Sequence, residues 1–168
     1  MHTLYFISVV LHILAATIWI GGIGFLVLVV VPWLRSGGRV AAGTFLRETG
    51  QRFRTVGWTC FGVLIVTGTF NLWYRGVRPR HFVDPVWLQS ATGSAIALKL
   101  AVFALVLAIS VVHDFNVGPR ATRAIEHDPR GSEAARLRRQ ASLLGRVNAL
   151  LALALLVIAV AIVRGWPL

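Results

Sequence analysis

Charged residues and cysteine are scarce in this chain. Only 14% of its 168 residues are charged, against about 25% in typical soluble domains, while 57% are hydrophobic. This composition excludes an ordinary soluble domain. The single cysteine, Cys60, excludes an internal disulfide and a CxxC metal motif. The sequence therefore predicts a membrane protein.

Four apolar blocks cover most of the chain, at about residues 4–34, 53–74, 92–113 and 141–163. Each has the roughly 20 residues that a helix needs to cross the hydrocarbon. Strand alternation is absent, and backbone groups in lipid must be paired internally. We expect an all-α integral membrane four-helix bundle, with residues 1–168 forming a single transmembrane domain. The first block lacks a positively charged start and is too long for a signal peptide.

The net charge of +11 is unevenly distributed between the loops. Arginines concentrate in the first and third loops, 35–54 and 114–140, which predicts that these loops are cytoplasmic and that both termini lie outside the cytoplasm, in a bacterial-type inner (plasma) membrane. Such loops attract anionic membrane lipids. No nucleic-acid reading module accompanies the charge, so nucleic acid is not an expected partner. A homo-oligomer or a larger membrane complex stays open.

Two loops have features of their own. The first loop, RVAAGTFLRETGQRFR, is compatible with a short interfacial helix or with a solvated connector. In the third loop, Ser132 can cap a helix that runs on into the fourth span.

His12 is an ionisable group about 12 Å deep in the first span. It shares a helical stripe with Ser8, Ala15, Ala16 and Trp19. Small side chains around an imidazole, with a flat indole below, suit a planar ligand such as haem, in which neutral imidazole binds iron. The alternative is a histidine hydrogen-bonded across the bundle, with small residues allowing close helix approach.

Lys99 is the only lysine, and its depth in the third span nearly matches that of His12. No span supplies an acid at that depth, so its partner is either a ligand carboxylate, such as a haem propionate, or water reached by snorkelling. Thr67 and Asn71 lie one turn apart on the second span, where they can bond to a ligand or to neighbouring helices.

His113 and Arg146 lie near the inner ends of their spans. The depth difference of about 15 Å or more argues against His12 and His113 binding one haem. His113 then serves a second, inner site or sits beside Asp114 at the membrane surface. Arg146 either reaches an inner anionic group or is an interfacial arginine, and Asn148 points to nearly the opposite side.

Copper is the alternative ligand. Met1, His2, His81 and Asp84 are expected on the outer side, above His12, and sulfur and imidazole ligands suit copper.

Several segments resemble the copper-resistance protein D (CopD) family: His12-x6-Trp19-x-Gly21-Gly22, RTVGWTCFGVLIVTGTFNLW, ALKLAVFALVLAISVV and LLGRVNALLALALLVIAV. They are also similar to the HemJ-type protoporphyrinogen oxidases. The HemJ-like resemblance implies haem b, with functional positions at His12, Lys99 and Arg146. The CopD-like resemblance, closer through the first three spans, implies copper handling at the inner membrane.

Together these observations predict a membrane haem b protein with a redox or electron-transfer role. His12 is the expected axial metal ligand, Trp19 lies against the ring and Lys99 near a propionate, with Asn71, His113 and Arg146 as further cofactor-binding candidates. Copper transport, a structural subunit of a larger complex and a HemJ-like oxidase are the alternatives.

Overall fold

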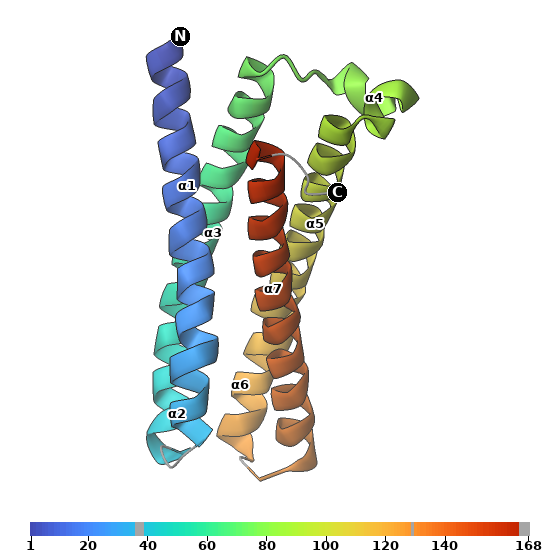
Figure 1. Cartoon of the computed structure of the whole chain (residues 1–168). Coiled ribbons are helices and arrows are strands. Elements are labelled where there is room, and N and C mark those ends of the chain that lie inside the picture. The colour runs from blue at the N-terminus through green and yellow to red at the C-terminus, as the bar shows by residue number, and fades with distance from the viewer. Residues whose placement is uncertain (36–38, 129, 165–168) are drawn as a thin grey trace.

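Long helices make up the described part of the chain. The computed structural model describes the backbone of residues 1–35, 39–128 and 130–164, and the side chains of these residues outside 34–47. The longest helices are α1 (His2–Phe25), α3 (Arg39–Tyr74), α5 (Ala91–Val112) and α7 (Ser132–Arg164), and within the described ranges there is no strand (Figure 1). The predicted all-α class is confirmed.

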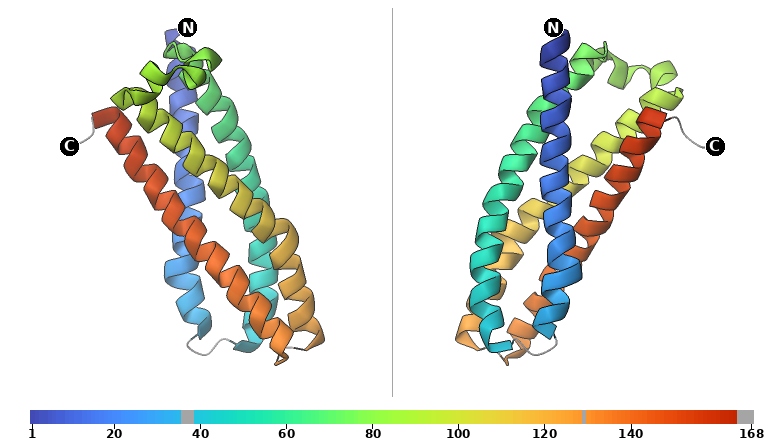
Figure 2. Two further views of the ribbon diagram at one scale, coloured as in Figure 1. Left: turned by 90° about the vertical axis from the view of Figure 1, so that its right-hand side faces the viewer. Right: turned by 60° about the vertical axis from the view of Figure 1, so that its left-hand side comes forward.

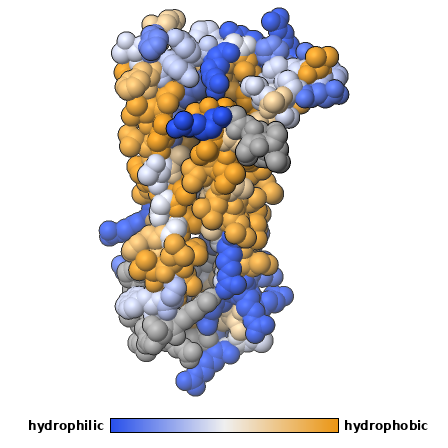
Figure 3. All heavy atoms as spheres, viewed as in Figure 1, coloured by the Kyte–Doolittle hydropathy of each residue, from blue (hydrophilic) through white to orange (hydrophobic). Residues whose placement is uncertain are grey.

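In the described part of the chain, four helical segments are long and apolar enough to cross a membrane: His2–Trp33, Glu48–Tyr74, Ala91–His127 and Ser132–Arg164. The predicted number of helices long and apolar enough to span a membrane is confirmed. α1 packs against α3, and α5 against α7, and the latter two run side by side at a tilt to α1 (Figure 2). Much of the visible surface between the two ends is apolar (Figure 3), as expected of a bundle surrounded by lipid. The start of α1 and the end of α7 lie toward the same end, called here the upper end.

The predicted first and third loops are mostly helical. α3 is one helix of 36 residues that includes most of 35–54, so neither an interfacial helix nor a solvated connector describes this segment. After α5, η3 (His113–Val117) and α6 (Gly118–His127) continue the helix into the predicted loop 114–140. Arginine, alanine and glutamate form helices well in water, so falling hydropathy marks the edge of the hydrocarbon rather than the end of the helix. The predicted helix that leads into the fourth span is present, and Ser132 is its first residue.

Among the described residues, two π-helical turns interrupt the long helices, and each is followed by a proline. η1 (Leu26–Val30) precedes α2 (Val31–Arg35), whose second residue is Pro32, and η3 precedes α6, whose second residue is Pro119. Proline lacks an N–H and its ring clashes with the carbonyl four residues earlier, so the turn before it widens. At the second π-helical turn, η3, the Gly118 N–H donates to the His113 carbonyl, and a Cβ at position 118 would lie 2.9 Å from that oxygen.

A short cap joins α3 to α5 at the upper end. It consists of η2 (Pro79–Val83) and α4 (Pro85–Gln89). The Asp84 carboxylate accepts from the Val86 N–H at 2.9 Å, and the Ser90 hydroxyl accepts from the Gly93 N–H at 3.1 Å. These bonds satisfy free N–H groups at the two helix starts.

Candidate functional site

The His12 imidazole on α1 meets the Thr67 hydroxyl on α3, with 2.8 Å between Nδ1 and Oγ1. The same hydroxyl donates its one hydrogen to the Val63 carbonyl, 2.6 Å away on the preceding turn. Thr67 Oγ1 must therefore accept from Nδ1–H, because a hydroxyl carries a single hydrogen. This fixes the neutral tautomer of His12 and leaves the lone pair on Nε2. No hydrogen bond to Nε2 is present in the described part of the chain.

The ring is also held by close approach of the two helices. The Ser8 hydroxyl donates to the Thr67 carbonyl at 3.4 Å, and a Cβ at Gly68 would lie 3.3 Å from His12 Cε1. Ser8, Ala15 and Trp19 are buried, so the predicted stripe of α1 faces the bundle interior. The hydrogen bond across the bundle, one of the two interpretations of His12, is present at Nδ1, and Nε2 stays available for a ligand.

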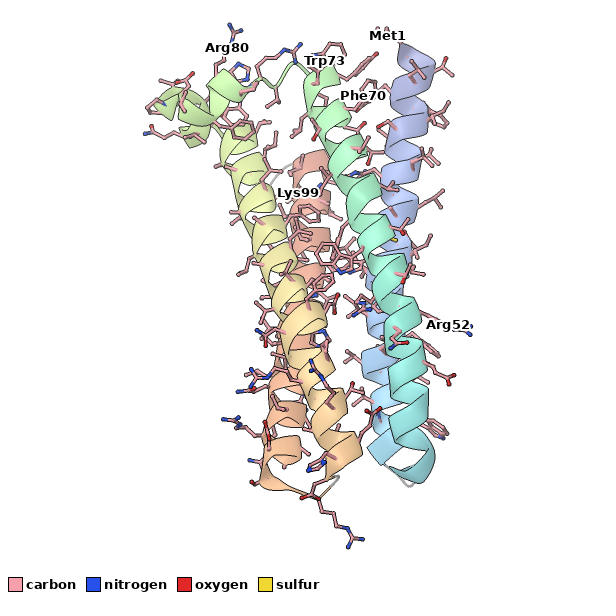
Figure 4. The ribbon with its side chains drawn as sticks, turned by 180° about the vertical axis from the view of Figure 1, so that it is seen from behind. Met1, Arg52, Phe70, Trp73, Arg80 and Lys99 are labelled. Carbon is pink, nitrogen blue, oxygen red and sulfur yellow. The ribbon has the colours of Figure 1, made fainter. Side chains whose placement is uncertain are left out.

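Lys99 on α5 lies close enough to His12 to interact with it electrostatically. It lies between α5 and α3, in the half of the bundle that holds Met1 (Figure 4). The Arg75 guanidinium, one residue past the upper end of α3, interacts electrostatically with the Lys99 ammonium. Among the described residues, Lys99 has neither a hydrogen-bond partner nor an ion-pair partner. The structure thus places His12 and Lys99 within electrostatic reach of each other, as their similar depths predict.

Asn71 lies on α3 one turn above Thr67 and one turn below Arg75. Its side-chain oxygen is buried without a hydrogen-bond partner. We call Ser8, His12, Thr67, Asn71 and Lys99 the His12 cluster. None of its members is a carboxylic acid, and Lys99 gives it positive charge. It thus combines one free imidazole lone pair with a cation.

His113 lies toward the opposite end of the bundle, where the α5 helix gives way to η3. Its Nδ1 is 2.8 Å from Asp114 Oδ1, and the Trp58 indole N–H donates to Asp114 Oδ2 at 3.0 Å. Arg54 donates to the Asp114 backbone carbonyl at 3.3 Å. Of the two interpretations of His113, the structure matches the one beside Asp114, with 38% of the His113 side chain exposed. We call these four residues the His113 cluster.

Arg146 is not brought to His12. It is exposed on α7 and lines a hollow of about 280 Å³. Asn148, two residues further on, points to the interior and donates to the Ser110 hydroxyl at 3.0 Å. The prediction that these two residues face nearly opposite sides is confirmed.

The remaining candidates have structural partners. Trp19 is 3% exposed and packs on Phe61, with ring centroids 5.1 Å apart, so it belongs to the core that includes Leu64, Val106 and Leu155. At the upper end, His81 accepts from the Arg78 N–H and stacks on Trp87, and Asp84 caps α4. Within the described ranges, no three His, Cys, Asp or Glu side chains form a group able to hold a metal ion.

Sequence reasoning missed Arg75, because it falls at the start of a predicted loop. Its spacing of eight residues from Thr67, with Asn71 midway, is the signal that places it on the same face of α3. The partners of Asp114 were missed too, since Trp58 and Arg54 come from another span.

One comparison with known proteins identifies a family. The family model described as "Copper resistance protein D" matches residues 47–162, which include Thr67, Asn71 and Lys99, whereas His12 precedes the matched region. A protein of Aquifex aeolicus (strain VF5), described as uncharacterized, is 32% identical over 157 residues, covering 93% of each chain. No solved structure matches the chain.

Proposed function

The chain belongs to the copper resistance protein D (CopD) family, and we propose that it binds a copper ion within the membrane and passes it on, with His12 Nε2 as the ligand. One observation carries this proposal. The hydrogen bond from His12 Nδ1–H to Thr67 leaves the other ring nitrogen with its lone pair. Metal-binding histidines commonly hold their second nitrogen in this way, which fixes the tautomer and the ring orientation.

Copper is cargo in this proposal rather than a resident cofactor. Imidazole nitrogen suits copper, but one imidazole without a neighbouring carboxylate or thiolate holds the ion weakly. Lys99 weakens the hold further, since its charge repels a cation. Weak binding suits passage through a membrane, because an ion that moves must also leave its site.

Copper flux into proteoliposomes tests this proposal. The His12→Gln variant keeps a polar side chain but loses the imidazole, and we expect it to lose most of the uptake. The matched control is His113→Gln, which removes the histidine of the other cluster and keeps the flux. Wild-type flux in His12→Gln would refute the role of His12.

Haem b is the second candidate for the same nitrogen, and the unpaired Lys99 favours it. An ammonium within electrostatic reach of His12 suits a metal whose macrocycle carries carboxylates, so Lys99 would receive a propionate while His12 Nε2 held the iron. Bound haem b would supply one-electron transfer. A HemJ-like oxidase is a further form of this candidate.

The Lys99→Gln variant separates the two candidates because the expected effects have opposite signs. If copper is the ligand, removing the positive charge tightens copper binding; if haem b is the ligand, the same change weakens haem retention. Equilibrium copper binding and the visible absorption of the purified protein measure the two effects. The control Lys99→Arg keeps the charge and is expected to behave like the wild type. Absence of both ligands would instead support a structural subunit.

We also propose that the upper end faces away from the cytoplasm in a bacterial-type inner membrane. The arginines of segments 35–54 and 114–140 support this orientation. Replacing Cys60 with serine and adding one cysteine at Ser132 allows labelling with a membrane-impermeant reagent. We expect labelling of inside-out vesicles and none of intact cells, and the reverse pattern would contradict the orientation.

A further inference from the structure

A basic hollow lies on the lower half of α7 and shares no lining residue with the two clusters described above. It is lined by Arg138, Arg139, Ser142, Leu143 and Arg146. None of these lining residues is acidic, and Arg139 and Arg146 are exposed. We propose that this hollow binds the phosphate headgroup of an anionic phospholipid.

The chemistry of the lining favours a phosphate group. A guanidinium presents N–H groups in a planar fork that matches two oxygens of a phosphate. Ser142 lies one turn before Arg146 on the same side of the helix and adds a hydroxyl donor. The hollow therefore offers both charge and hydrogen bonds to one anionic group.

The same face of α7 continues upward as an apolar stripe. From Arg139, positions 143, 146, 150, 153 and 157 follow at alternating spacings of four and three residues, which keeps them on one side of the helix. The apolar members are well exposed, with Leu143 at 60%, Leu150 at 67%, Leu153 at 54% and Val157 at 63%.

The dimensions of this stripe fit a lipid. From Arg146 to Val157, the helix rises about 16 Å, which is about half the thickness of the hydrocarbon core and so the depth of one leaflet. Hydrophilic surface gathers at the lower end of the molecule and apolar surface follows above it (Figure 3). A headgroup at the arginines thus places its acyl chain along exposed leucine and valine side chains. This combination favours a phospholipid over a soluble phosphate.

Lipid binding by the purified full-length chain in detergent tests the proposal, with native mass spectrometry counting bound phosphatidylglycerol. The site variant is Arg139→Gln/Arg146→Gln. Its matched control, Arg120→Gln/Arg136→Gln, removes the same charge from exposed arginines outside the hollow. At about 1 kcal/mol per arginine, we expect phosphatidylglycerol to bind the site variant about thirtyfold more weakly, and the control to bind it almost as tightly as the wild type.

A single Arg139→Gln variant, expected to weaken binding about fivefold, gives the same test with less perturbation of the helix. Equal weakening in the two double variants would overturn the proposal, since the attraction would then be diffuse. Equally tight binding of phosphatidylcholine would also overturn it. So would equally tight binding of glycerol phosphate, because the hollow would then take a soluble phosphate. None of these outcomes depends on copper or haem at His12.

Discussion

His12 and His113 each lie on a membrane-spanning segment, and each has one ring nitrogen 2.8 Å from an oxygen of another residue. Both leave Nε2 without a hydrogen-bond partner in the described structure, so their surroundings differ in charge: His113 faces a carboxylate, whereas His12 faces a hydroxyl and lies within electrostatic reach of Lys99. At His113, Asp114 uses one carboxylate oxygen for the imidazole and the other for the Trp58 N–H. At His12, the hydrogen bond to Thr67 leaves a lone pair on Nε2, and nearby Lys99 is unpaired in the described structure.

The difference teaches that a polar residue in a membrane span is not by itself a site. The negative charge of Asp114 in the His113 cluster is balanced within the protein, since its carboxylate contacts an imidazole and an indole N–H and a guanidinium lies nearby. Such a network links α3 to the end of α5 and stabilises the bundle. The His12 cluster has no acid to balance Lys99, so it combines a histidine Nε2 without a partner with a cation that no described residue pairs with.

Replacing Thr67 with valine is expected to have the largest effect on the His12 cluster. Valine has almost the same shape but cannot accept from His12 Nδ1–H, so the imidazole loses the partner that fixes its tautomer. Loss of such a partner commonly lowers metal affinity by about 10–100-fold, and we expect a decrease of this size in copper binding. Thr67→Ser keeps the hydroxyl and is expected to retain most of the affinity. Unchanged copper affinity in Thr67→Val would show that the hydrogen bond does not prepare the ligand.

Replacing Asp114 with alanine is expected to affect stability instead. The Trp58 indole N–H loses its acceptor, and an unsatisfied donor of this kind costs about 1–3 kcal/mol. Denaturant unfolding in detergent micelles measures the loss, with the exposed Glu133→Ala as the control. Copper affinity should stay at the wild-type level. A large loss of copper binding in a folded Asp114→Ala protein would mean that the two clusters do not have separate roles.

A smaller effect is expected at Gly68. An alanine Cβ there would lie 3.3 Å from His12 Cε1, which is tight enough to shift the ring by a few tenths of an ångström. We expect copper affinity to fall modestly and the helices to stay folded. Gly62→Ala, whose Cβ would have no neighbour within 4 Å, is the control, and an equal effect of both substitutions would indicate a general change in α3.

The sequence predicts the spans well because hydrophobic length alone determines them. It does not predict where the helices end, since the arginine-rich segments are good helix formers outside the hydrocarbon. Pro32 and Pro119 indicate the two π-helical turns, but a hydropathy profile does not show them.

The site is partly predictable for a related reason. Periodicity places Ser8, His12 and Trp19 on one face, and depth pairs His12 with Lys99. The register of α1 against α3 decides that His12 meets Thr67, and this depends on packing between residues more than fifty positions apart. Rotation of α7 likewise decides that Arg146 faces outward, although its offset from Asn148 was known.

The most direct test of the central claim is nitrogen NMR of the protein labelled with ¹⁵N-histidine, before and after addition of Cu(I). The account predicts that His12 is protonated at Nδ1 in the free protein, and that copper shifts its Nε2 resonance while Nδ1 stays protonated. His113 should not respond. Protonation of His12 at Nε2 in the free protein, or a copper shift at Nδ1 or only at another histidine, would contradict it.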